Sequence, residues 1–208
     1  MIAIIDYGMG NLHSVSKAVE RLGYEYAFVS DEEALNQAEG AILPGVGAFG
    51  DAMKNLKERG LEEPIRQFAA SGKPLLGICL GMQLLFASST EHGEHEGLGI
   101  LPGRVLRFSG DYKIPHMGWN RLDFLQKNRI FSGVEEGYVY FVHSYFLQPT
   151  EENRPVLLAT ADYHQEVPGI VGRGNVYGMQ FHPEKSGTVG MQLLENFAKL
   201  CETASTKR

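Results

Sequence analysis

One of the two cysteines in the sequence, Cys79, lies between glycines in the segment G-I-C-L-G, residues 77–81. The apolar residues before it predict a buried strand over residues 74–79, and those after it predict a helix over residues 80–88. A nucleophile on a sharp turn from strand to helix needs small neighbours, because the turn strains its backbone. The start of the helix also favours the thiolate form. The segment therefore predicts a nucleophilic cysteine, whereas a lone buried cysteine is most often structural.

A cysteine nucleophile needs a base, and His182 is the strongest candidate among the seven histidines. It lies in the segment Q-F-H-P-E-K, residues 180–185, directly after an apolar run, so we expect it at the end of a strand. Glu184 follows two residues later, and in an extended segment the two side chains share a face. A carboxylate beside an imidazole fixes its tautomer and stabilises its protonated form. Together with Cys79, the pair predicts a Cys-His-Glu triad, although the pair alone is typical of a solvated surface.

A glycine-rich loop, P-G-V-G at residues 44–47, follows the apolar run of residues 41–43. In hydrolases with a nucleophile elbow, the amide after the nucleophile and an amide from a loop after an earlier strand stabilise the oxyanion. The corresponding groups here are the backbone N–H groups of Leu80 and Val46. Glycines on both sides of Val46 allow its peptide to rotate. In isolation the same four residues predict only a turn.

Composition excludes several classes of function. The chain has 208 residues with 19 basic and 25 acidic side chains, a net charge of −6 and no basic stripe, so we expect no nucleic-acid partner. No apolar run is long enough to span a membrane, and two cysteines favour a reducing, cytoplasmic location. No cluster has the spacing of metal ligands, and the turn at residues 8–10 fails the dinucleotide fingerprint because His13 replaces its third glycine. We therefore expect no metal or cofactor.

The first 90 residues alternate strands and helices, which predicts a parallel sheet wrapped by helices. Expected strands are 2–6, 24–29, 41–43 and 74–79, and expected helices are 12–22, 51–58 (with Asp51 as N-cap), 61–70 and 80–88. The second half is rich in strands, at 104–108, 119–125, 138–146, 156–163, 169–172 and 176–181, before a closing helix at 187–203. We predict one α/β domain over residues 1–203, with a mixed, mostly parallel central sheet flanked by helices, and a disordered tail at 204–208.

The motifs P-G-V-G, G-I-C-L-G-M-Q and Q-F-H-P-E-K-S together resemble the class I (triad) glutamine amidotransferases, which have a flavodoxin-like fold. The resemblance covers about residues 2–200. Three further segments, D-Y-G-M-G-N-L at 6–12, P-H-M-G-W-N at 115–120 and Y-F-V-H-S-Y at 140–145, are similar to the members that serve imidazole glycerol phosphate synthase. This resemblance implies hydrolysis of L-glutamine to L-glutamate and ammonia without a cofactor. It also implies a heterodimer in which the ammonia passes to a (β/α)8-barrel synthase subunit in histidine biosynthesis.

The same resemblance assigns further roles. It implies that glutamine is held by Gly47, Gln83, Ser144 and Tyr145. It implies that the partner and the ammonia exit are faced by Trp119, Tyr140 and Lys185, and that the pocket walls are supported by His116 and His143.

Three alternatives stay open from the sequence. The chain could be a glutaminase serving another synthase, which the P-H-M-G-W-N segment disfavours. It could be a cysteine hydrolase or protease of similar fold, but these often place the base soon after the nucleophile, whereas here 182 − 79 = 103 positions separate the two. It could also be a non-catalytic binding subunit, which the intact Cys79, His182 and Glu184 disfavour.

Overall fold

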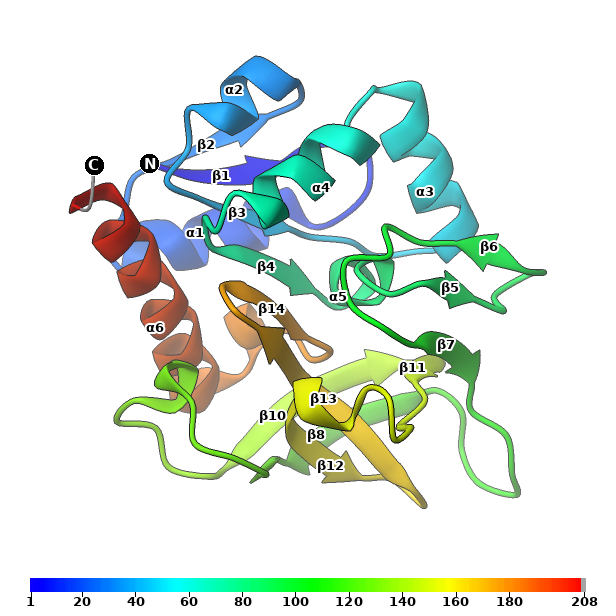
Figure 1. The fold of residues 1–208 in the computed structure, drawn as a ribbon. Helices are drawn as coiled ribbons and strands as arrows, with labels where there is room; N and C mark the ends of the chain where they lie inside the picture. Colours follow the sequence, from blue (N-terminus) through cyan, green and yellow to red (C-terminus); the bar gives the residue numbers. More distant parts are fainter. Residues whose placement is uncertain (207–208) are drawn as a thin grey trace.

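A computed structural model describes residues 1–206, with the side chains of residues 1–204, and is built around one eight-stranded sheet (Figure 1). The strand order is β2-β1-β3-β4-β14-β13-β12-β9. Five neighbouring strands run parallel: β2 (Tyr26–Val29), β1 (Ile2–Ile5), β3 (Gly40–Leu43), β4 (Leu75–Ile78) and β14 (Val176–Met179). The sheet continues antiparallel through β13 (Glu166–Arg173), β12 (Leu157–Asp162) and β9 (Asp123–Phe124). The prediction of a mixed, mostly parallel sheet is confirmed.

Helices cover both faces of the parallel strands, which explains why every residue of β1, β3, β4 and β14 is buried. One face packs against α2 (Glu32–Asn36), α3 (Phe49–Glu58) and α4 (Glu62–Ala70), whose apolar side chains share one core cluster. The other face packs against α1 (Leu12–Arg21) and α6 (Gly187–Thr206), which belong to a second cluster. The three-layer arrangement is visible in Figure 1.

Helices α3 and α5 (Leu80–Leu84) each differ from the prediction at one end. Helix α3 begins at Phe49 rather than Asp51, and its N-cap residue, Ala48, makes no side-chain cap. Instead the Phe49 N–H donates to the carboxylate of Glu91, at 3.1 Å. Helix α5 spans only Leu80–Leu84, because the chain then turns into β5 (Ser88–Ser89) instead of continuing as a helix to residue 88. The short α2, capped by the Asp31 side chain, was not predicted.

The strands outside the main sheet form two small sheets. One has the order β11-β7-β5-β6 and contains β11 (Tyr145–Leu147), β7 (Arg104–Arg107) and β6 (His95–Glu96) in addition to β5. The other pairs β10 (Tyr138–His143) with β8 (His116–Arg121). The predicted strand over 138–146 is therefore interrupted at Ser144, and its two parts belong to different sheets. At this interruption Ser144 and Tyr145 line the same cavity as Cys79.

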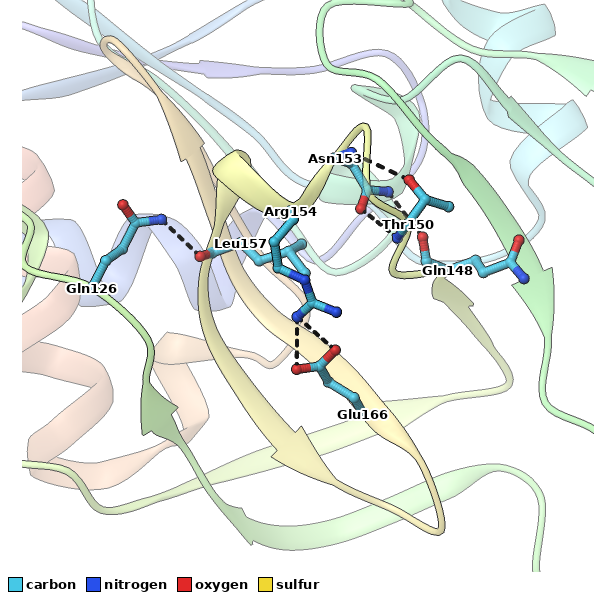
Figure 2. Close-up of polar contacts among 7 residues, drawn as sticks. All are labelled: Gln126, Gln148, Thr150, Asn153, Arg154, Leu157 and Glu166. Atoms are coloured by element: carbon cyan, nitrogen blue, oxygen red, sulfur yellow. Dashed lines mark hydrogen bonds and ion pairs between the residues drawn. The ribbon is translucent and has the colours of Figure 1, made fainter.

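The segment that follows β11 is tied down by polar contacts (Figure 2). Asn153 donates from Nδ2 to the Gln148 carbonyl at 2.9 Å and accepts at Oδ1 from the Thr150 N–H at 2.8 Å. Next to it, in the 3-10 turn η2 (Arg154–Val156), Arg154 pairs with Glu166 at 2.8 Å. These contacts fix the exit of β11 and so help to hold the residues that precede it.

The C-terminal helix extends further than predicted. It continues to Thr206, beyond the expected end at Thr203, so residues 204–206 are helical rather than a tail. Residues 207–208 lie outside the described residues, where the disordered tail stays a prediction, as do the domain bounds. Within residues 1–206, none of the helices is long and apolar enough to cross a bilayer.

Candidate active site

Cys79 lies at the turn between β4 and α5 in a strained backbone conformation. Its φ is +55° and its ψ is −114°, in a region that residues with a side chain rarely adopt. The flanking glycines are required by close contacts. A Cβ on Gly77 would lie 2.5 Å from the Gly81 carbonyl oxygen, and a Cβ on Gly81 would lie 1.8 Å from the Leu43 carbonyl oxygen. The geometry of this turn therefore requires the two glycines of the G-x-C-x-G segment.

His182 comes from the second half of the chain and lies at the same edge of the sheet as Cys79. Strand β14 is the parallel neighbour of β4, with Met179 opposite Ile78, and the Cys79 N–H donates to the Met179 carbonyl at 2.8 Å. Both functional segments therefore leave the carboxyl ends of adjacent parallel strands, which is where open α/β sheets bind ligands.

His182 is held between Glu184 and the thiol. Its Nδ1 donates to Glu184 Oε1 at 2.8 Å, which leaves the other ring nitrogen for Cys79. Burial by itself lowers the pKa of His182, but hydrogen bonds to Cys79 and Glu184, together with their negative charges, outweigh it and raise this pKa from 6.5 to about 9. The imidazole is thus charged at neutral pH.

The segment that carries His182 and Glu184 is held by hydrogen bonds to Tyr140 on β10 and to Ser186. It forms the 3-10 turn η3 (Pro183–Lys185), and the His182 N–H donates to the Tyr140 carbonyl at 3.2 Å. The hydroxyl of Ser186 donates to the His182 carbonyl at 2.6 Å and accepts from the Tyr140 N–H at 2.9 Å. Glu184 is buried, and its Oε2 has no hydrogen-bond partner among the described residues, so its carboxylate depends on the charge of His182.

A cavity of about 430 Å³ opens over the thiol. It is lined by all of the residues predicted to bind glutamine or its oxyanion, together with neighbours: Val46, Gly47, Cys79, Leu80, Gln83, Glu91, Val142, His143, Ser144, Tyr145 and His182. Glu91 was not foreseen, because a lone acidic residue in a polar loop gives no sequence signal for a pocket. Two residues of the predicted triad, Cys79 and His182, therefore line the same cavity as helix α5, the loop at residues 46–47 and the junction of β10 and β11.

A second residue that sequence reasoning missed is Gln180. The side-chain amide of Gln83 donates to the Tyr145 carbonyl at 3.0 Å and to Gln180 Oε1 at 3.1 Å, and Gln180 Nε2 lies 4.0 Å from Cys79 Sγ. Gln180 stands in the Q-F-H-P-E-K-S segment, and its position two residues before His182 was the signal that could have found it. The amides of Gln83 and Gln180 therefore link the thiol to the Tyr145 backbone.

One of the two predicted oxyanion donors is engaged within the protein, since the Leu80 N–H donates to the Gly45 carbonyl at 3.2 Å. We call this the closed arrangement of the loop at residues 44–47. Gly45 has no room for a side chain, because a Cβ there would lie 2.6 Å from the Tyr7 hydroxyl oxygen. That hydroxyl in turn donates to the Pro44 carbonyl at 2.6 Å. Val46 is exposed at the mouth of the cavity.

The residues predicted to face a partner lie outside the cavity lining. The rings of Trp119 and Tyr140, paired across β8 and β10, have centroids 6.0 Å apart, and Lys185 is exposed nearby on η3. Trp119 is 57% exposed, and Met117 and Tyr138 on the same two strands are 49% and 60% exposed. Among the described residues, no group of three His, Cys, Asp or Glu side chains could hold a metal ion.

Sequence comparison relates this chain to characterised enzymes. Residues 3–201 match the family described as "Glutamine amidotransferase class-I". A relative from Geobacillus kaustophilus (strain HTA426), named "Imidazole glycerol phosphate synthase subunit HisH", is 59% identical over 203 residues, covering 95% of this chain and 95% of that protein. The protein of the same name from Bacillus subtilis (strain 168) is 52% identical over 215 residues, covering 100% of each chain.

Structure comparison agrees on the fold. A structure described as "Crystal structure of glutamine amidotransferase" superimposes with a TM-score of 0.76 at 24% identity, covering 97% of this chain and 100% of the other. The "Structure of PurLQS from Thermotoga maritima" superimposes with a TM-score of 0.71 at 21% identity, covering 95% and 97%. At these identities the likeness concerns the fold alone. The family match over nearly the whole chain is what decides the relationship: this protein belongs to the class-I glutamine amidotransferases.

Proposed function

We propose that this chain is the glutaminase subunit of imidazole glycerol phosphate synthase, acting in the cytoplasm in histidine biosynthesis. It hydrolyses L-glutamine to L-glutamate and ammonia and delivers the ammonia to a (β/α)8-barrel synthase subunit. The observation that carries the glutaminase chemistry is the arrangement of Cys79, His182 and Glu184 at the ends of the adjacent strands β4 and β14. Full-length relatives at 52–59% identity support the choice of synthase.

In this mechanism the Cys79 thiolate attacks the side-chain amide carbon of glutamine. His182, charged at the outset because its pKa is raised to about 9, gives its proton to the departing ammonia. A glutamyl thioester forms as the C–N bond breaks. His182, now neutral, takes a proton from water, whose oxygen attacks the thioester, and glutamate leaves as the thiolate is restored. Glu184 keeps the Nδ1–H tautomer throughout.

The cavity also offers a partner for the charged α-ammonium group of free glutamine. The substrate carries an α-ammonium group, and Glu91 places a carboxylate in the cavity wall. That carboxylate is itself held by the Phe49 N–H at the start of α3, so its position is fixed before substrate binds. We therefore add Glu91 to Gly47, Gln83, Ser144 and Tyr145 as a residue that holds glutamine.

The oxyanion site requires one peptide to rotate. The Gly45 carbonyl and the Val46 N–H belong to the same peptide unit and point in opposite directions. Rotating this unit withdraws the carbonyl from the Leu80 N–H, to which it is bonded at 3.2 Å, and turns the Val46 N–H toward the thiol. A single movement thus releases one donor and supplies the other. We expect low activity in the closed arrangement, because each missing oxyanion donor costs roughly 3 kcal/mol of transition-state stabilisation.

The partner would dock on the outer face of β8 and β10. Met117, Trp119 and Tyr138 expose large apolar side chains there, which is the usual mark of an interaction surface. Tyr140 lies opposite Trp119 on this face, and both Tyr140 and Lys185 adjoin the segment of His182, which supports a role for them at the exit of ammonia. Exposed Val46 offers the partner a direct contact with the oxyanion loop.

The test is an assay of glutamate release from glutamine. The purified chain is measured alone, with the barrel subunit, and with the barrel subunit plus its ribonucleotide ligand, and each measurement is repeated with Cys79→Ala. We expect strong release only in the complete mixture and none with the variant. Activity that does not respond to the barrel subunit would retain the glutaminase chemistry but refute the choice of synthase. Activity that survives in Cys79→Ala would refute the nucleophile.

A further inference from the structure

Two buried histidines that take no part in the mechanism above face each other on neighbouring strands. His116 on β8 is directly opposite His143 on β10 in the strand register. Both side chains are buried, and Nδ1 of His116 lies 3.0 Å from Nε2 of His143. Direct contact between two imidazoles excludes a charge on both, so the protons on this pair must be ordered.

The order of the protons follows from the groups that contact the two ends of the histidine pair. A carbonyl can only accept, so the Nδ1 of His143, 2.8 Å from the Tyr145 carbonyl oxygen, carries the proton. In the neutral ring Nε2 is then an acceptor, and Nδ1 of His116 donates to it. The remaining nitrogen of His116, Nε2, accepts from the side-chain amide of Asn120 at 3.2 Å. Burial lowers the pKa of His116 to about 4 and that of His143 to about 3, so both rings are neutral near pH 7.

The hydrogen bonds that run from His116 through His143 to the Tyr145 carbonyl form a relay. Aromatic neighbours hold its first ring, that of His116. His116 is stacked between Phe141 and Tyr163, with centroid distances of 4.6 Å and 4.1 Å and interplanar angles of 20° and 18°. A ring packed on both faces keeps its orientation, so its Nδ1–H stays aimed at His143. A substitution of His116 can therefore remove the hydrogen bond to His143 while it keeps a ring between Phe141 and Tyr163.

The relay joins the glutamine cavity to the outer face of β8. At its inner end the Tyr145 carbonyl accepts from both His143 and Gln83, two residues that line the cavity. At its other end is His116, whose side chain points to the opposite face of β8 from exposed Met117 and Trp119, so the backbone of β8 is the link to the outer face. A displacement of β8 therefore reaches the Tyr145 backbone through only two side chains.

We propose that His116 is a positioning residue that, through His143, fixes the Tyr145 carbonyl and with it Gln83, and so couples the docking face on β8 to glutamine binding. This inference rests on the proposed function and goes beyond it, since it assigns a route by which the partner tunes substrate affinity. His116 touches neither substrate nor reacting atoms and acts through His143.

Two substitutions separate the hydrogen bond from the packing. His116→Phe keeps a ring between Phe141 and Tyr163 but removes the donor to His143. His116→Asn removes the ring but keeps an N–H close to the position of Nδ1. If the relay operates, His116→Phe raises the KM for glutamine about tenfold, the effect of one buried hydrogen bond, with a smaller change in kcat. His116→Asn then restores the KM to within about twofold of the parent, despite a lower Tm.

The kinetics are measured in the complex with the barrel subunit and its ribonucleotide ligand. A KM that is unchanged in His116→Phe, or raised equally in both variants, would overturn the relay in favour of simple packing. Imidazole ¹⁵N spectra of the parent protein give a readout that needs no activity: we expect His116 and His143 to be Nδ1-protonated and not to titrate between about pH 6 and 9. Either ring in the Nε2–H form refutes the relay. If the parent complex releases no glutamate, the proposed function fails, while the spectra still decide the order of protons.

Discussion

Cys79 and Cys201 are both free and both buried, at 8% and 2% exposure, but their surroundings differ. Cys201 lies in the middle of a helical turn of α6, where its thiol donates to the Phe197 carbonyl at 3.5 Å. Burial is the main reason why the pKa of its thiol is raised to about 12. Cys79 instead lies on a strained turn beside a charged His182.

Burial by itself therefore does not make a cysteine reactive. Around Cys201 burial keeps the thiol protonated and inert, and it packs closely on the backbone of β3 at Gly40. Around Cys79 the same degree of burial strengthens the interaction with an imidazolium, because few water molecules screen it. The difference lies in the surroundings: the charged ring of His182 lies beside Cys79, whereas Cys201 has its own helix and β3 around it.

The largest expected effect contrasts the two thiols directly. Cys79→Ala should lower glutaminase turnover in the active complex by about 10⁴-fold or more, because the covalent route is lost. Cys201→Ala should leave turnover unchanged. Glutamate release by both variants, at matched protein concentration, is the measurement. Comparable losses in the two variants would mean that the contrast concerns folding and not chemistry.

The next prediction removes the charge that orients the base. Glu184→Gln keeps the size of the side chain but allows an amide N–H to face the ring, which favours the wrong tautomer of His182. We expect turnover to fall by about 10²- to 10⁴-fold with little change in the KM for glutamine. Initial rates over a range of glutamine concentrations give both constants. Turnover at the parental level would show that His182 is oriented by its backbone contacts alone.

A third prediction concerns pH and stability. Because the folded-state pKa of His182 is raised from 6.5 to about 9, the folded protein holds this proton more tightly than the unfolded chain does. The resulting stabilisation is complete below pH 6.5 and is lost as the pH rises through about 9. Relative to His182→Gln, the free energy of unfolding should fall by on the order of 3 kcal/mol between about pH 6 and pH 10. Urea unfolding at both pH values measures it, and parallel profiles for the two proteins would contradict it.

The smallest expected effect tests the packing role of Cys201. A Cβ on Gly40 would lie 2.1 Å from Cys201 Sγ, so Gly40→Ala should destabilise the fold by about 1–3 kcal/mol. Adding Cys201→Ala removes the sulfur and should recover much of this loss, giving a coupling energy of about 1 kcal/mol or more. Cys201→Ala alone is the matched control, because it removes the sulfur without adding a Cβ at Gly40. Additive losses at Gly40 and Cys201 would show that the two positions do not share a contact.

The sequence was most informative where the chemistry depends on neighbours in the chain. The strained turn at Cys79 requires glycines at fixed positions, and the pairing of His182 with Glu184 requires a spacing of two. Alternating apolar runs likewise predicted the parallel strands and both helical layers. Each of these signals is local, because the physical constraint acts within a few residues.

Tertiary structure decided what depends on distant segments. The interruption at Ser144, the carboxylate of Glu91 in the cavity and the hydrogen bond from Leu80 to the Gly45 carbonyl left no mark in the sequence. The order of protons on His116 and His143 likewise follows from contacts across two strands. Such features arise where separate elements meet, and the residue types they use are equally common at positions with no partner. Local patterns therefore led to the prediction of Cys79, His182 and Glu184 as site residues, whereas only the packing of the two halves determined the shape of the cavity and the hydrogen bond between Leu80 and Gly45.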